Sequence, residues 1–201
     1  GAKTGAFAEY AICPASNLHI VPAGMPAPLA AAYPAAYTTA YVSLAIRGAL
    51  KAGETLLVHG ASGGVGMATL DVGRLLGAKT IATTASTQKA QALKHAGAQE
   101  VIVLGDKPGD NFREQVKAFT SGKGADVIFD PVGGDVFDES TRCIAFNGRL
   151  LIIGFAGGRI ATVNTNIPLI KGFSVVGVRA GEYGRRFPAE GRKVRDQIWT
   201  W

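Results

Sequence analysis

The sequence is poor in cysteine, and its two cysteines lie far apart. Cys13 and Cys143 form no C-x-x-C pair, and the three histidines are scattered singly along the chain. A structural zinc site takes four ligands, usually cysteines and histidines at short spacings. The sequence therefore predicts no bound metal. Two isolated thiols are typical of a reduced protein, and we expect a cytoplasmic location.

The chain also lacks a long hydrophobic run and a high density of charge. Although 47% of its 201 residues are hydrophobic, no stretch approaches the roughly 18 apolar residues that cross a bilayer. No secretory signal pattern opens the chain, and because it does not begin with Met we expect the sequence to start within a longer protein. This composition excludes a membrane span and favours one main globular domain.

The positive charge is modest and unevenly placed. The net charge is +6, and residues 179–201 carry six basic and three acidic side chains. A basic stripe can bind nucleic acid, but this segment has no recognised motif and little aromatic interleaving beyond Trp199 and Trp201. A solvated helix face is the favoured interpretation, and a structural or RNA-binding role is the weaker alternative.

From residue 54 onward the sequence alternates short apolar runs with helical stretches. Six runs are apolar on both faces, as strands are when helices cover both sides of a sheet: residues 54–60, 78–84, 100–105, 125–130, 148–154 and 173–178. Four stretches between them have helical spacing: residues 64–77, 86–97, 110–122 and 135–146. This alternation predicts an α/β fold, a Rossmann-type, doubly wound parallel sheet of six strands.

The first part of the chain has a different pattern. Residues 5–22 alternate like an exposed edge strand, and residues 22–28 are rich in proline and predict a linker. Residues 28–50 predict an Ala-rich helical hairpin that is broken near Pro34. We therefore assign residues 1–22 to the end of a preceding domain, and residues 23–201 to the domain that contains the sheet.

A glycine cluster follows the first predicted strand of the sheet. Gly63 and Gly66 occupy the second and third glycine positions of the pattern G-x-G-x-x-G, and Ala61 stands at the first. Such a loop between a strand and a helix lets backbone N–H groups approach a pyrophosphate at the positive end of the helix dipole. In this strand and helix context the cluster predicts a dinucleotide-binding site.

The end of the second predicted strand indicates which dinucleotide binds. Residues 72–99 contain no acidic residue, whereas an enzyme that uses NAD would place Asp or Glu there to bind the adenine ribose. The segment instead offers the hydroxyls of Thr83, Thr84 and Ser86, followed by Lys89. Ser86 and Lys89 can bind a 2′-phosphate, which predicts NADPH. Alternatively, Ser86 is the N-cap of the next helix and Lys89 an exposed helix residue; both roles can coexist.

Several longer motifs occur in register along the chain: GAFAEYAICPA, PAAYTTAY, LKAGETLLVHGASGGVG, ADVIFDPVGG and IIGFAGG. Their order resembles the quinone oxidoreductase, or zeta-crystallin-like, branch of the medium-chain dehydrogenase/reductase superfamily, over essentially the whole chain. In that family alanine is ordinary at the position of Ala61. The resemblance implies that residues 1–22 are a remnant strand of a GroES-like barrel domain, which is otherwise absent from this sequence together with a returning C-terminal segment.

The resemblance also implies roles for individual residues. Thr38 would lie near the nicotinamide ribose and phosphate, and two strand-end segments would line the nicotinamide ring. The residues implied to bind the cofactor in these places and at the pyrophosphate are Thr38, Ser62, Gly63, Gly64, Val65, Gly66, Val132, Gly133, Gly154, Phe155 and Ala156. Structural alternatives are open: Thr38 could bond back within its helix, and the glycines could only form turns.

The activity that the resemblance implies is zinc-independent hydride transfer from NADPH to a quinone or an α,β-unsaturated carbonyl. We assign no catalytic residue, because the proton donors would come from the missing barrel. Leu104 stands where family members often carry a tyrosine beside the 2′-phosphate, so affinity for NADP would be lowered. An NADP(H)-binding module without turnover is the alternative to an enzyme.

The last predicted strand, residues 173–178, would lie at the edge of the sheet. An uncovered edge invites pairing with another chain, and the resemblance implies that two such edges pair across a dimer. We therefore expect a homodimer. The alternative is an edge that the basic segment after it covers.

Overall fold

The computed structural model describes residues 5, 7–15, 18–105 and 112–201. The chain divides into two compact units, Gly1–Tyr33 and Pro34–Trp201. The described residues between 5 and 22 contain no strand, so the predicted edge strand is wrong for these residues. A lone strand has no ladder to satisfy its N–H and C=O groups, and an alternating pattern alone therefore does not make one.

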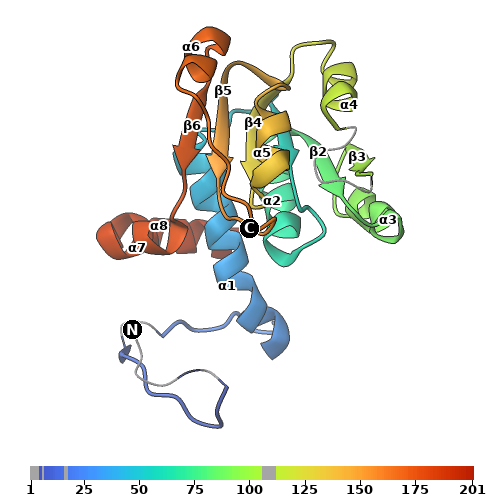
Figure 1. The fold of residues 1–201 in the computed structure, drawn as a ribbon. Coiled ribbons are helices and arrows are strands. Elements are labelled where there is room, and N and C mark those ends of the chain that lie inside the picture. Colours follow the sequence, from blue (N-terminus) through green and yellow to red (C-terminus); the bar gives the residue numbers. More distant parts are fainter. Residues whose placement is uncertain (1–4, 6, 16–17, 106–111) are drawn as a thin grey trace. The chain divides into compact units, whose positions relative to one another are not determined.

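The second unit contains a six-stranded sheet in which every pairing is parallel. The strand order is β3-β2-β1-β4-β5-β6 (Figure 1). The strands are β1 (Thr55–Val58), β2 (Lys79–Thr84), β3 (Glu100–Val103), β4 (Ala125–Asp130), β5 (Ile144–Ile152) and β6 (Ser174–Gly177). This order is the doubly wound Rossmann order and confirms the predicted fold. From β1 the chain builds the sheet outward first on one side, through β2 and β3, and then on the other, through β4 to β6. Such sheets bind ligands at this switch point between β1 and β4, outside the carboxyl ends of the strands.

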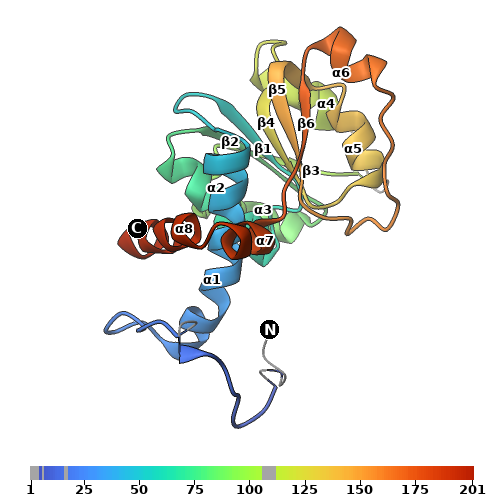
Figure 2. The ribbon, with the colours of Figure 1, turned by 90° about the vertical axis from the view of Figure 1, so that its left-hand side faces the viewer.

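Helices connect the strands and cover both faces of the sheet, as Figure 2 shows. The helices are α1 (Ala27–Tyr41), the π-helix η2 (Val42–Arg47), α2 (Gly64–Leu75), α3 (Thr87–His95), α4 (Phe112–Phe119), α5 (Gly134–Ser140), α6 (Asn166–Lys171), α7 (Ala180–Arg186) and α8 (Pro188–Thr200). None of the helices in the described part of the chain is long and apolar enough to cross a membrane.

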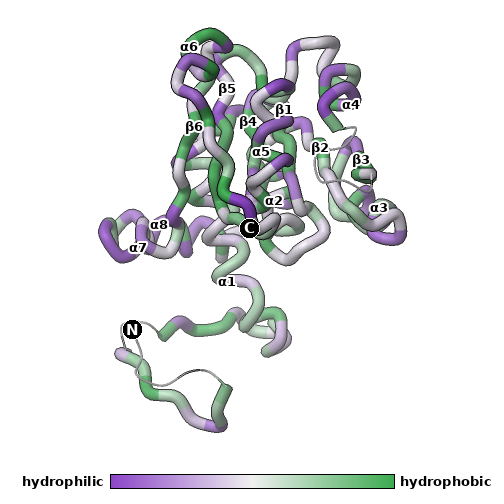
Figure 3. The backbone as a smooth tube through the Cα atoms, viewed as in Figure 1, coloured by the Kyte–Doolittle hydropathy of each residue, from purple (hydrophilic) through white to green (hydrophobic). Residues whose placement is uncertain are grey.

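The core has two halves because neighbouring residues of a strand face opposite sides of the sheet. Leu56 and Val58 of β1 pack with Leu70 of α2 on one face. Leu57 packs with Val116 of α4 and with side chains of α5 on the other face. Figure 3 accordingly shows hydrophobic colour along the central strands and hydrophilic colour on the outer helices α3, α4 and α7. The double-sided apolar pattern of the strands is thereby explained.

The region before the sheet differs from the predicted hairpin. Pro34 lies inside the single helix α1, and Pro28 of the predicted linker lies in its first turn. A proline fits the first turn because the N–H groups there have no helical acceptor. Pro34 is exposed, so water can satisfy the carbonyl that loses its helical partner, and the helix continues into η2.

The boundary between α5 and β5 also differs from the prediction. The helix predicted over residues 135–146 ends at Ser140, and β5 begins at Ile144 rather than at residue 148. Ile144 pairs with Ala125 of β4, and the register then shifts before Arg149 pairs with Val127. Pairing with the central strand outweighs the helical spacing of this segment, because sheet contacts decide where local propensity is weak.

The basic segment at the end of the chain forms α7 and α8, as a solvated helix face predicts. Val194 and Ile198 are buried, whereas most of the basic side chains are exposed. The ring of Trp201 lies 5.5 Å from that of Tyr41. The segment is therefore held by its apolar side, and its charges face solvent.

Candidate functional site

The glycine loop lies at the carboxyl end of β1, at the point where the strand order reverses. Gly60 has a φ of 58°, in the left-handed region that favours glycine. Ala61 N–H donates to Thr83 O of β2 at 3.1 Å, and Gly63 N–H donates to Gly60 O at 3.1 Å. These bonds fix the loop against β2 and direct the chain into α2.

Two glycines of this loop are needed for different reasons. A Cβ on Gly66 would lie 2.4 Å from Gly60 O, so α2 can pack against the loop only with glycine there. A Cβ on Gly64 would meet nothing within 4 Å and would extend into open space at the start of α2. Gly66 therefore serves packing, whereas Gly64 keeps the helix N-terminus accessible.

The N-terminus of α2 can hold an anion. The first helical bond runs from Met67 N–H to Gly63 O at 2.9 Å. The N–H groups of Gly64, Val65 and Gly66 precede it, and a helix leaves such groups without helical acceptors. Together with the helix dipole they favour a phosphate at this place. The predicted pyrophosphate residues, Ser62 to Gly66, thus form one continuous turn around an accessible helix end.

A cavity of about 340 Å³ opens beside this loop. It lies between the ends of β1, β2, β3 and β4, and its lining is His59, Gly60, Ser62, Thr83, Thr84, Ala85, Leu104, Gly105, Val132 and Val136. The lining is mostly apolar or small. A flat base fits such a space, which lies next to the start of α2.

The hydroxyl groups at the end of β2 are not equivalent. Thr83 is fully buried, and its Oγ1 lies 3.0 Å from His59 Nδ1. Thr84 donates to Ser62 Oγ at 3.3 Å and accepts from Ser86 N–H at 3.1 Å. Ser86 stands at the N-cap position of α3, as the alternative predicted, but its side chain makes no capping bond there. Thr83 faces inward, and Ser86 is the hydroxyl of this group that is left uncommitted among the described contacts.

Lys89 lies one helical turn beyond Ser86 on α3 and is exposed. The ion pairs of the described residues do not include it. The structure thus presents a hydroxyl and an ammonium group near the end of β2 without an acidic neighbour on α3. This set suits a phosphate better than a ribose diol.

The loops after β4 and β5 are joined by backbone hydrogen bonds. Ala156 N–H donates to Pro131 O at 3.0 Å, and Gly157 N–H donates to Val132 O at 2.8 Å. Gly133 has a φ of 72°, which supports the turn interpretation for this glycine. The two segments predicted to line the nicotinamide ring, Val132–Gly133 and Gly154–Ala156, are therefore brought side by side.

A buried carboxylate organises the turn after β4. Asp130 Oδ1 accepts hydrogen bonds from Val132 N–H at 2.8 Å and from Gly133 N–H at 2.9 Å. Burial raises the pKa of Asp130, and the two N–H donors act against this rise. Asp130 also lines a small cavity of about 80 Å³ with Gly133, Phe137, Ile152, Gly154, Phe155, Ala161, Val163 and Val175. Its carboxylate is therefore a structural acceptor at the edge of the predicted nicotinamide region.

Thr38 lies half-buried on α1 and is not among the residues that line either cavity. Its neighbour Thr39, rather than Thr38, bonds back to the helix at Ala35 O with a distance of 2.8 Å. Tyr37 Oη donates to Asp71 Oδ2 at 2.9 Å and so ties α1 to α2. The role of Thr38 beside the nicotinamide ribose stays a prediction.

Two functional candidates escaped the sequence reasoning. His59 lines the larger cavity and Asp130 the smaller one, and both are buried. Each is a polar residue that follows a run of buried apolar residues at the carboxyl end of a strand. That placement, at the edge where ligands bind, is the signal that could have found them.

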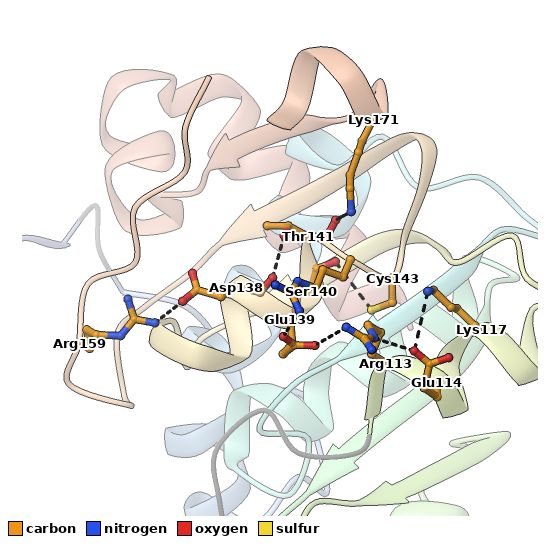
Figure 4. Close-up of polar contacts among 11 residues, drawn as sticks. Arg113, Glu114, Lys117, Asp138, Glu139, Ser140, Thr141, Cys143, Arg159 and Lys171 are labelled. Atoms are coloured by element: carbon orange, nitrogen blue, oxygen red, sulfur yellow. Dashed lines mark hydrogen bonds and ion pairs between the residues drawn. The ribbon is translucent and has the colours of Figure 1, made fainter. Parts of the chain in front are cut away.

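A polar network surrounds the C-terminal end of α5 and is shown in Figure 4. Arg113 of α4 pairs with Glu139 at 3.3 Å, and Lys171 Nζ donates to Thr141 O at 2.8 Å. Burial, followed by the like charges of Lys117 and Arg142, lowers the pKa of Lys171. Near the start of α5, Arg159 pairs with Asp135 at 2.8 Å, and it also pairs with Asp138 further along the helix. Both ends of α5 are therefore fixed by charged contacts.

Cys143 lies within this network, but its thiol is unreactive. Its thiol is buried, and burial raises its pKa to about 12. Among the residues that the structure describes, no three His, Cys, Asp or Glu side chains gather as metal ligands would. The described residues of this site therefore do not fit a zinc ion.

The strand order, the glycine turn after β1 and the accessible start of α2 define a Rossmann-type nucleotide-binding domain. The pattern of one protein family, described as zinc-binding dehydrogenase, matches residues 64–196. The chain belongs to this family, and within the medium-chain dehydrogenase/reductase superfamily it belongs to the quinone oxidoreductase branch.

Three similar proteins illustrate this relation. Quinone oxidoreductase-like protein 2 of Bos taurus is 37% identical over 158 residues, which are 78% of this chain and 44% of that protein. The structure of mycobacterial Rv1454c complexed with NADPH aligns with a TM-score of 0.82 and 28% identity, over 94% of this chain and 58% of that one. The nucleotide-binding subdomain of the enoylreductase domain of PpsC from Mycobacterium tuberculosis aligns with a TM-score of 0.72 and 29% identity.

The extent of these matches is uneven. The chain spans less than half the length of the bovine relative, yet the PpsC match covers 83% of this chain and 91% of that subdomain. The chain therefore corresponds to the nucleotide-binding region of its relatives.

Proposed function

We propose that this chain is the nucleotide-binding part of an NADPH-dependent, zinc-independent reductase. The parent enzyme would transfer hydride to a quinone or an α,β-unsaturated carbonyl. The observation that carries the proposal is the accessible N-terminus of α2 beside a cavity lined by Thr84 and Ala85, which directly precede Ser86 and the exposed Lys89 in a stretch without an acid. The relative that was solved in complex with NADPH supports the choice of cofactor.

The adenosine half would occupy the 340 Å³ cavity. Ser62 to Gly66 would bind the pyrophosphate through backbone N–H groups, and Ser86 and Lys89 would bind the 2′-phosphate. Leu104 lines the cavity as an apolar wall and adds no donor there. A phosphate held by a hydroxyl and an exposed ammonium should bind with a marked dependence on salt.

The nicotinamide half would lie along Val132, Gly133 and residues 154–156. Bound NADPH supplies the hydride; the residues of this chain orient the ring and exclude water from one side of it. Charge that develops on the acceptor needs hydrogen-bond donors. We assign no acid or base of this chain to that task, because the described lining of the smaller cavity offers only Asp130, whose carboxylate is engaged with backbone N–H groups.

The test measures binding and turnover together. Calorimetry with NADPH and NADH should show tighter binding of NADPH to this chain, and a quinone should be tried as the acceptor in an NADPH oxidation assay. Binding without turnover would favour the binding-module alternative for this chain and leave the parent enzyme in place. Absence of binding to both cofactors would refute the proposal.

The RNA-binding alternative has less support. Within α7 and α8, Glu182 pairs with Arg185 and Arg186, and Glu190 pairs with Lys193. These pairs offset part of the basic charge, as expected of a solvated helix surface. Retention of RNA that disappears at moderate salt would revive this alternative.

We also propose a homodimer through β6. This strand is the last of the sheet order, and Val175 and Val176 are half-buried. An unpaired edge with valines suits continuation of the sheet by a second copy. Light scattering should give the mass of two chains; the mass of one chain would contradict the proposal.

A further inference from the structure

His59 is a fully buried histidine that connects three elements around the larger cavity. It follows β1, its Nδ1 lies 3.0 Å from Thr83 Oγ1 of β2, and its Nε2 lies 2.9 Å from Ser140 Oγ of α5. The ring packs edge-on against Phe112 of α4, with centroids 4.8 Å apart. Such a residue is not explained by packing alone, because a leucine would fill a buried site without needing two polar partners.

The hydrogen-bond directions follow from the partner of Ser140. Ser140 Oγ donates its hydrogen to Val136 O at 2.7 Å. A hydroxyl has one hydrogen, so Ser140 can only accept from the imidazole, and Nε2 carries the proton. Nδ1 is then the acceptor, and Thr83 is the donor to it. Burial lowers the pKa of His59 to about 3, so this neutral form persists at neutral pH.

This arrangement determines what the cavity offers a ligand. Because the hydrogen of Thr83 is directed to His59, Thr83 offers the cavity no donor. The hydrogen of Thr84 is directed to Ser62. Among the described hydroxyls that line the cavity, Ser62 therefore keeps its hydrogen for a ligand, next to the start of α2.

We propose that His59 is a positioning residue for the adenosine half of the cofactor. By accepting from Thr83, it fixes the Thr83 side chain in the wall of the cavity and holds the end of β2 at its distance from β1 and α5. The inference rests on the proposed function, since it assumes that the cavity receives adenosine. It adds a residue that acts through Thr83 and does not itself touch the phosphates.

Two similar substitutions separate positioning from mere stability. The amide of Asn reaches about as far as Nδ1, so His59→Asn keeps an acceptor for Thr83. The amide of Gln reaches about as far as Nε2, so His59→Gln keeps the contact with Ser140 and loses the acceptor for Thr83. Calorimetry would use 2′,5′-ADP as the probe, at a temperature where circular dichroism shows each variant folded.

We expect His59→Gln to weaken 2′,5′-ADP binding about tenfold, because it leaves a buried hydroxyl without its acceptor. His59→Asn should stay within about threefold of the wild type, and Thr83→Val should weaken binding as His59→Gln does. The matched control is Ser140→Ala, which removes the other partner. It should lower the melting temperature while binding stays near the wild-type value.

A spectroscopic measurement on the wild type tests the same inference without a variant. ¹⁵N NMR of the imidazole should show Nε2 protonated and Nδ1 unprotonated, and 2′,5′-ADP should perturb the Nδ1 resonance. Protonation at Nδ1, or equal 2′,5′-ADP affinity of folded His59→Gln and His59→Asn, would overturn the inference while leaving NADPH binding intact. If the wild-type chain binds neither NADPH nor 2′,5′-ADP, the proposed function fails and the inference fails with it.

Discussion

The two ends of the parallel sheet are held together by different kinds of contact. At the amino end, Arg149 donates to both carboxylate oxygens of Glu54, at 3.1 and 2.6 Å, and to the carbonyls of Gly48 and Ala49. At the carboxyl ends of β1 and β2, the contacts are those of the neutral His59 and of hydroxyl and backbone groups. At β1 and β2 the difference separates two tasks: charged groups stabilise the amino end, whereas neutral groups leave the carboxyl end open to an anion. At the carboxyl end of β4, the carboxylate of Asp130 is engaged by two backbone N–H groups.

At the amino end of the sheet, both Arg149 and Glu54 have hydrogen-bond partners besides each other. Partial burial by itself would raise the pKa of Glu54, but the hydrogen bonds from Arg149 and from Lys51 N–H outweigh burial and lower it. Nearby, Asp126 Oδ2 accepts from Thr55 N–H at 2.9 Å, and Lys123 pairs with Asp126 Oδ1 at 2.8 Å. A charged group of this kind at the carboxyl end would compete with the phosphates of a cofactor.

The largest effect of a substitution is expected in the glycine loop at the carboxyl end of β1. Gly66→Ala forces a Cβ to within 2.4 Å of Gly60 O, and we expect it to cost about 3 kcal/mol of unfolding free energy and to abolish NADPH binding. Gly64→Ala is the control, since its Cβ enters open space. It should keep the stability in urea denaturation but weaken NADPH in calorimetry. Equal stability losses in both variants would contradict the separate roles of these glycines.

At the amino end, Arg149→Met should affect stability alone. It removes the bidentate pair with Glu54 and the two bonds to carbonyls, and we expect a loss of about 2 kcal/mol in urea denaturation. The affinity of the folded variant for NADPH should be unchanged in calorimetry. A large loss of affinity with unchanged stability would show that the two ends are not separate in function.

The pH dependence of stability tests the neutral carboxyl end. The folded-state pKa of His59, about 3, lies below its ordinary value of 6.5, so the unfolded chain takes up the proton first. The stabilisation is complete above pH 6.5 and declines as the pH falls toward 3, by about 2 kcal/mol at pH 5. Urea denaturation between pH 7 and pH 5 measures this slope, and His59→Asn should flatten it. An unchanged slope in that variant would assign the pH dependence to other groups.

The smallest expected effect is at Lys89, which is exposed on α3 beyond the end of β2. Lys89→Ala removes an exposed ammonium group, so stability should be unchanged, while the Kd for NADPH should rise about fivefold at low salt. The Kd for NADH, which lacks the 2′-phosphate, should stay the same in parallel calorimetry. A matching rise for both cofactors would remove Lys89 from the 2′-phosphate site.

The sequence was sufficient for the sheet, the crossovers and the glycine loop, because these depend on local apolar patterns and on glycine spacing. It was insufficient where the position of a residue depends on a contact with a residue far away in the sequence. The bond from His59 to Ser140 joins residues 81 positions apart, and Thr83, one of the hydroxyl residues that the sequence offered at the end of the second strand, is turned inward by His59. The start of β5 at Ile144 depends on Ala125 in the same way. The alternating residues 5–22 predicted a strand because a pattern cannot reveal whether a neighbouring strand exists.

The joined loops after β4 and β5 have a practical consequence for engineering. Their mutual bonds, Ala156 N–H to Pro131 O and Gly157 N–H to Val132 O, use main-chain atoms only. Side chains at positions 132, 155 and 156 can therefore be exchanged without cutting the connection between the loops. A small combinatorial library at these three positions would vary the surface that is predicted to line the nicotinamide ring, on an unaltered scaffold.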